Sequence, residues 1–270
     1  MTVGPGDSLY VLDRSRRLSV FSPSQQFARS VQMLYNPEVI VVEPDGKLVG
    51  KMSIATADRA GYNVHVLSSS SELLRSIGQT SEPQLDPRCR ACADQRLAPG
   101  PVLGTVWIAA ANRYSFDLWI ATGSVEARYV VKGADWFADW DKPALWLDGS
   151  EPKNSSVLRV FGDSHHRIWV YGVHAPSDWS PHLLPPGGAL SSDRGAIIGP
   201  RAALDDWVFE NETKDTEAVI DVIDTQIRSV VVSARIRGEM VFLNASTAYH
   251  FTRDAMGEMM IDVYRVSLRQ

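Results

Sequence analysis

The amino-acid sequence predicts an all-β fold, and two observations lead to that prediction. Runs of β-branched and aromatic residues recur along the chain and are separated by Gly, Pro, Asp and Ser, which favour turns. An Asp-Ser or Asp-Gly turn that leads into an apolar strand also returns, at Asp7-Ser8, Asp45-Gly46 and Asp163-Ser164. The spacing is roughly forty residues or a multiple of it, which is typical of propeller blades. We therefore expect a β-propeller of about five recognisable antiparallel blades.

The order of strands and turns divides the chain into five units within a single propeller domain, residues 1–270. The first expected strand starts at Leu9, only a few residues from the N-terminus. The expected strands are 9–12, 17–21 and 27–33 in the first unit; 39–42, 48–54, 62–67 and 73–77 in the second; 102–110, 115–121 and 125–131 in the third; 157–161, 167–173, 218–223 and 227–236 in the fourth; and 240–243, 248–252 and 259–268 in the fifth.

A long irregular insertion, residues 175–216, interrupts the fourth unit. It is rich in Pro and Gly and shows no sustained hydrophobic period. An irregular segment of this length in a compact domain is either a functional lid or a surface excursion without a role. The sequence leaves both interpretations open.

The blade-forming residues resemble a known family. The stretches Asp7–Asp13, Arg17–Phe21, Arg167–Val170, Ala175–Trp179 and Tyr264–Leu268 are similar to the six-bladed β-propeller proteins of bacteria that are related to NHL-repeat propellers. This resemblance implies a further N-terminal blade that is missing here, and export to the periplasm or the extracellular space. No signal-peptide pattern is present at the N-terminus. The resemblance implies architecture and no activity.

The best candidates for ligand binding lie in the stretch 135–141, which contains three aromatic and three acidic residues. Asp135, Trp136 and Trp140 could stack a sugar or hold a cation against an aromatic face. The alternative is that these aromatic side chains fill the space between two blades. Further candidates are Arg113 and Tyr114, from the preceding unit, and Trp179, at the start of the insertion.

Cys89 and Cys92 are the only cysteines and form one C-x-x-C pair within a Pro-rich loop. A zinc site needs four ligands, and the sequence has no second pair. In an exported protein the pair is a candidate disulfide. Free thiols and a redox or metal role remain alternatives.

An enzymatic alternative is a metal-dependent hydrolase or lactonase of the gluconolactonase-like propeller type. Such chemistry needs Asp, Glu and Asn side chains that converge on a cation in the central channel. Asn112, Asp163, Asn244 and Glu43 have suitable side chains. No catalytic residue, metal ligand or cofactor is predicted, because no nucleophile can be tied to a base by sequence.

Composition limits the partners. The net charge of −5 and the pI of about 5.7 argue against nucleic acid, and no apolar run approaches the ~20 residues of a membrane span. We therefore predict a non-enzymatic propeller that binds an unknown small molecule or protein on one face of its ring.

Overall fold

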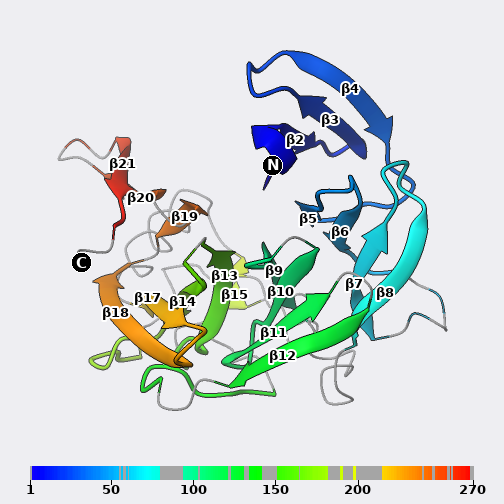
Figure 1. Ribbon diagram of the computed structural model, residues 1–270. Helices are drawn as coiled ribbons and strands as arrows, with labels where there is room; N and C mark the ends of the chain where they lie inside the picture. Colours follow the sequence, from blue (N-terminus) through cyan, green and yellow to red (C-terminus); the bar gives the residue numbers. More distant parts are fainter. Residues whose placement is uncertain are drawn as a thin grey trace.

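The computed structural model contains five antiparallel sheets arranged as the blades of a β-propeller, which confirms the predicted all-β fold (Figure 1). The structure describes residues 2–54, 56, 59, 61–79, 94–102, 104–120, 123–130, 134–141, 151–163, 165–181, 189–190, 197–198, 215–238, 240–244, 247–253, 256 and 258–267.

In the described residues, the first four blades have four strands each and the fifth has three. Blade 1 contains β1 (Thr2–Val3), β2 (Leu9–Leu12), β3 (Arg17–Phe21) and β4 (Phe27–Gln32), and blade 2 contains β5 (Val39–Val42), β6 (Leu48–Lys51), β7 (Tyr62–Leu67) and β8 (Leu73–Gln79). Blade 3 contains β9 (Gln95–Pro99), β10 (Thr105–Ala110), β11 (Ser115–Ile120) and β12 (Ser124–Val130), and blade 4 contains β13 (Ser156–Gly162), β14 (Arg167–His174), β17 (Glu217–Asp224) and β18 (Ser229–Arg237). Blade 5 contains β19 (Val241–Asn244), β20 (Thr247–Arg253) and β21 (Met259–Arg265).

The remaining elements are short. A 3-10 turn, η1 (Pro5–Asp7), joins β1 to β2, and β15 (Ala189–Leu190) pairs with β16 (Ile197–Ile198) inside the predicted insertion. Since β14 pairs directly with β17, the segment between them does not interrupt the sheet.

The blades follow one another in chain order. The innermost strands β1, β5, β9 and β13 lie beside one another in that order, and each blade then runs outward to its last strand (Figure 1). Blades 1 and 5 are the two ends of this row. They do not share a sheet in the described residues, because β1 pairs with β2 and β21 pairs with β20.

The hydrophobic core lies between neighbouring blades, where two apolar sheet faces pack together. Burial of each Val, Leu or Phe side chain at these interfaces contributes about 1.5–3 kcal/mol. Buried representatives are Leu18 and Leu48 between blades 1 and 2, Val64 and Val106 between blades 2 and 3, Phe116 and Val170 between blades 3 and 4, and Tyr171 and Phe242 between blades 4 and 5.

The recurring aspartates stabilise turns, as their pattern predicts. Asp163 accepts hydrogen bonds from the backbone N–H groups of His165 (2.8 Å) and Arg167 (3.2 Å), and from the Trp169 indole (2.9 Å). Asp45 accepts one from the Lys47 N–H at 3.1 Å. Such side-chain bonds replace backbone partners within a tight turn. Asp7 differs, because it ends η1.

Four strands were missed by the sequence prediction: β15 and β16, of two residues each, lie in the expected irregular insertion, and two others belong to blades. β1 lies in the segment that was expected to precede the first strand, and its two residues are too short to show a period. β9 lies between the expected strands 73–77 and 102–110, where the sequence predicts only a Pro-rich loop. Its apolar residues Leu97 and Ala98 are adjacent and pack against different blades, so the strand shows no alternation of apolar and polar residues.

Candidate functional site

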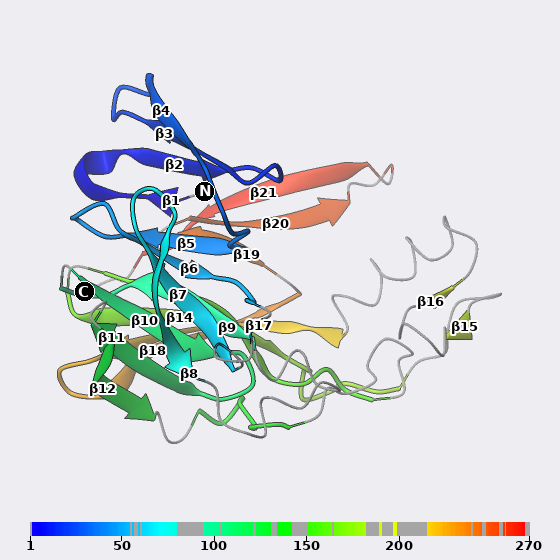
Figure 2. The ribbon, with the colours of Figure 1, turned by 90° about the vertical axis from the view of Figure 1, so that its right-hand side faces the viewer.

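The long connections emerge on one face of the ring. Strand direction alternates within each antiparallel sheet, so the connections β10–β11, β12–β13 and β14–β17 lie on the same face. We call this the loop face, defined by residues 111–114, 134–141, 175–181 and 215–216. In Figure 2 it is the right-hand side, where β15 and β16 are drawn. The opposite turn face is defined by residues 43–47, 100–102, 104, 163, 165–166 and 225–228.

The loop face brings together the predicted candidates of blade 3. The Asn112 side-chain amide donates a hydrogen bond to the backbone carbonyl of Trp140 at 2.7 Å. The backbone N–H of Trp140 donates one to the backbone carbonyl of Asn112 at 3.3 Å. Arg113 pairs with Asp141 and lies 3.3 Å from Asp139. These contacts fix the segment 134–141 over the β10–β11 turn.

Trp136 and Tyr114 lie deeper, in a buried cluster between blades 3 and 4. Their rings are perpendicular, with centroids 5.3 Å apart. Both donate hydrogen bonds to the buried carboxylate of Asp221, the Trp136 indole at 3.0 Å. Burial, and then the charge of Asp221, raise the pKa of the Tyr114 hydroxyl above its usual range. The tyrosine is therefore a neutral hydrogen-bond donor.

Sequence reasoning missed Asp221. The available signal is its place in β17: it shares a sheet face with Val219 and Ile223, which are both buried in the interface between blades 3 and 4. A carboxylate on the buried face of an apolar strand requires partners. Those partners are 107 and 85 residues away in the sequence, so the sequence alone does not reveal them.

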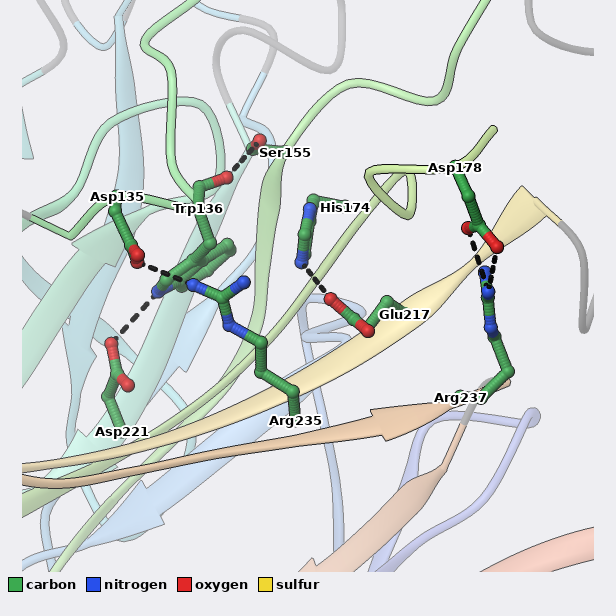
Figure 3. Close-up of polar contacts among 9 residues, drawn as sticks. All are labelled: Asp135, Trp136, Ser155, His174, Asp178, Glu217, Asp221, Arg235 and Arg237. Carbon is green, nitrogen blue, oxygen red and sulfur yellow. Dashed lines mark hydrogen bonds and ion pairs between the residues drawn. The ribbon is translucent and has the colours of Figure 1, made fainter. Parts of the chain in front are cut away.

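A row of paired charges crosses the surface above this cluster (Figure 3). Asp135 pairs with Arg235 at 2.6 Å, and Asp178 accepts two hydrogen bonds from Arg237, both at 2.7 Å. The bond from Arg237 lowers the pKa of Asp178.

Between these ion pairs lie His174 and Glu217, which are direct cross-strand neighbours (Figure 3). His174 Nε2 is 2.9 Å from Glu217 Oε2, and the imidazole lies against Trp136 with ring centroids 5.8 Å apart.

The two remaining tryptophan candidates are half-buried. The Trp140 indole donates to the Ser155 carbonyl at 2.6 Å, and the Trp179 indole donates to Asp215 at 3.0 Å. The loop face thus holds two partly exposed indoles and a buried third. Cys89 and Cys92 lie outside the described residues.

The residues considered for a channel cation do not all lie on one face of the ring. Asn112 is on the loop face, whereas Glu43 and Asp163 follow the innermost strands of blades 2 and 4 on the turn face. Asp163 is engaged by Arg167 and Trp169. Asn244 is the last residue of β19. Within the described part of the chain, no three His, Cys, Asp or Glu side chains are grouped to hold a metal ion.

Glu43 gives a testable pH dependence. Burial raises the pKa of this carboxyl, although the Gly104 N–H donates a hydrogen bond to it. Folding therefore favours its protonated form, and Glu43 reduces stability as the pH rises through and above its unfolded value. We expect Glu43→Gln to gain stability relative to wild type between pH 4 and pH 7.

The measurement is urea unfolding at both pH values. Asp45→Asn in the same turn is the control with the opposite sign, because the hydrogen bond from Lys47 lowers the pKa of Asp45. If the stability of both variants relative to wild type changed in the same direction between pH 4 and pH 7, the opposite pKa shifts of Glu43 and Asp45 would be contradicted.

Comparison with known proteins supports the fold. No protein-family model and no curated protein matches the sequence. Among solved structures, hydrazine synthase from Kuenenia stuttgartiensis superposes with a TM-score of 0.50 at 10% identity, covering 99% of this chain and 62% of that chain. A protein of unknown function from Bacteroides caccae (TM-score 0.44, 9% identity) is covered over 65% of its length, and a luciferin-regenerating enzyme (TM-score 0.42, 11% identity) over 75%. They match 87% and 98% of this chain.

The likeness to hydrazine synthase, at 10% identity, concerns the fold alone and not a function. The chain spans about 62% to 65% of the first two of these structures. In the described residues no helix has the length and apolar character needed to cross a membrane.

Proposed function

We propose that this β-propeller is a binding protein that engages a small ligand or a partner protein through its loop face. The observation that carries the proposal is the gathering of aromatic and charged side chains from three separate connections on this one face. Trp140 and Trp179 supply partly exposed indoles, and Arg113 supplies a guanidinium. An indole face stacks against the apolar face of a sugar ring, while the neighbouring carboxylates accept hydrogen bonds from its hydroxyl groups.

The ion pairs on this face are suited to exchange with a ligand. Asp139 and Asp141 are more than half exposed, and exposed salt bridges contribute only about 0–1 kcal/mol. A polar ligand can therefore replace Asp139 or Asp141 on Arg113 at small cost. In the buried cluster below, the Trp136 indole donates a hydrogen bond to Asp221, which keeps the backbone of residues 134–141 in place.

A binding role is favoured over catalysis because the charged side chains of Arg113, Asp135 and Asp178 are each engaged in an ion pair. The proposal retains two expectations from the sequence resemblance, namely membership of the six-bladed family and export. The alternative hypothesis is a metal-dependent hydrolase, and the experiment below also tests for it.

The test is a titration followed by tryptophan fluorescence, with neutral oligosaccharides, calcium chloride and a sugar lactone as probes. We expect a saturable response to an oligosaccharide, weakened about tenfold, or by ~1.4 kcal/mol, in Arg113→Ala and Trp179→Ala. Arg128→Ala is the matched control, because Arg128 also forms an exposed ion pair, with Asp117 in blade 3.

Three results would contradict the proposal. One is no saturable response to any probe, and another is equal binding by the Arg113→Ala variant. The third is calcium-dependent turnover of the lactone, which would establish the hydrolase instead.

A further inference from the structure

His65 is a buried titratable group that the proposed function does not use. It lies in β7, is 0% exposed, and shares a sheet face with Leu67, which packs against blade 1. Both nitrogens of its ring have partners. Nδ1 lies 2.8 Å from the hydroxyl oxygen of Ser76 in β8, and Nε2 lies 3.2 Å from the backbone carbonyl oxygen of Met52.

The chemistry of these partners fixes the direction of each hydrogen bond. A carbonyl oxygen only accepts, so Nε2 carries the proton of the neutral imidazole, and Nδ1 accepts from the Ser76 hydroxyl. The Arg59 guanidinium, which only donates, lies 3.4 Å from the same hydroxyl oxygen. The hydrogen bonds therefore run from Arg59 to Ser76, from Ser76 to His65 and from His65 to Met52.

These hydrogen bonds hold both ends of one connection. Residues 52–61 join β6 to β7, and this connection is the counterpart in blade 2 of the β10–β11 turn on the loop face. Met52 starts the connection, and Arg59 lies near its end. Both contacts depend on the protonation state of a single imidazole, so one proton can change how the connection is held.

We propose that His65 is a pH-sensitive switch that releases the Arg59 end of this connection when the imidazole is protonated. The imidazolium carries a proton on both nitrogens, so Nδ1 no longer accepts from Ser76. The Ser76 oxygen must then accept from two cations, Arg59 and His65, which repel each other. Arg59 leaves, because His65 is buried between two blades, and the bond from Nε2 to Met52 remains. The switch does not require the proposed ligand.

The electrostatics of the site agree with this geometry. Burial lowers the pKa of His65 below its usual value of 6.5, and the charge of Arg59 lowers it further, whereas hydrogen bonds to the backbone of Met52 and Tyr62 oppose the shift. Folding thus favours the neutral imidazole. The stability that this preference contributes is fully present above about pH 6.5 and is lost as the pH falls through the lowered pKa.

The other charged or titratable groups of the surrounding elements are directed elsewhere. Lys51, at the end of β6, pairs with Glu38 and Asp94. Tyr62 in β7 and Arg75 in β8 point to the opposite sheet face. On the His65 side, blade 1 contributes the uncharged residues Leu18, Val31, Met33 and Tyr35.

The test is amide hydrogen exchange of the whole protein at about pH 7.5 and about pH 5, corrected for the intrinsic pH dependence of exchange. We expect residues 53–61 of the wild type to lose protection about tenfold at the lower pH, while β10 keeps its protection. His165→Gln, in the turn between β13 and β14, is the control for histidine titration and should show the same loss. Circular dichroism at both pH values verifies that each protein is folded.

Two variants locate the switch. In His65→Gln the amide offers one donor and one acceptor but does not titrate, so residues 53–61 should keep their protection at both pH values. Ser76→Ala removes the hydroxyl that receives Arg59, so protection should already be low at the higher pH and should not fall further. The proposal is overturned if the wild type keeps its protection at the lower pH, or if either variant loses protection with pH as the wild type does.

Discussion

Replacing Asp221 by leucine is expected to lower the free energy of unfolding by about 3–5 kcal/mol. The carboxylate is 2% exposed and accepts hydrogen bonds from Tyr114 and Trp136. Leucine has a similar volume but no acceptor, so a hydroxyl and an indole N–H would remain buried without partners. Each such group costs about 1–3 kcal/mol. Denaturant unfolding followed by fluorescence measures the change.

The control is Asp117→Asn in β11. Asp117 forms a two-pronged pair with Arg128 on the outer surface, and its loss should cost about 1 kcal/mol or less. Asp221→Asn should fall between the two, because the amide oxygen still accepts one hydrogen bond. If Asp221→Leu were no more destabilising than Asp117→Asn, the buried cluster would not be holding blades 3 and 4 together.

Tyr114 adds a pH signature to the same cluster. Its pKa is raised by burial and by Asp221, so the folded protein holds the phenolic proton more tightly than the unfolded chain does. This contribution is fully present below the unfolded pKa of about 10 and is lost as the pH rises above it. We expect wild-type stability to fall above about pH 10, and to fall less steeply in Tyr114→Phe. Equal slopes in the two proteins would contradict this coupling.

The sequence predicted the blades well because their signals are local. The β-branched and aromatic run of β14 and the turn chemistry of Asp163 involve neighbours only a few residues apart. The same reasoning selected Trp136 and Tyr114 as candidates for ligand binding but left open whether such aromatic residues fill the space between blades. The structure buries both. Their use in binding, like that of Trp140 and Trp179, stays a prediction.

The remaining site features depend on contacts between residues that are far apart in the sequence. Asp221 lies among apolar residues of β17, and its role as a hydrogen-bond acceptor depends on Tyr114 and Trp136. The pairing of Arg235 with Asp135, and of Arg237 with Asp178, likewise joins distant parts of the chain. No period or spacing in the sequence carries this information, because ring geometry alone decides which connections meet on the loop face.

The close approach of Trp136 to Gly172 gives the second large prediction. A Cβ atom on Gly172 would lie 2.3 Å from Trp136 Cη2 and 3.0 Å from the Ser156 carbonyl oxygen. The indole cannot move away freely, because its N–H is bonded to Asp221. Gly172→Ala is therefore expected to cost about 1–3 kcal/mol of stability through overpacking. Denaturant unfolding again provides the measurement.

A double-mutant cycle identifies the cause. Trp136→Phe alone loses the indole hydrogen bond and packing, but its smaller ring leaves room for an alanine at residue 172. Gly172→Ala should consequently cost less in the Trp136→Phe background than in the wild type, by about 1 kcal/mol or more. An equal cost in both backgrounds would place the strain at the Ser156 carbonyl. The glycine would then serve the β13–β14 pairing rather than the docking of the loop segment that carries the proposed binding face.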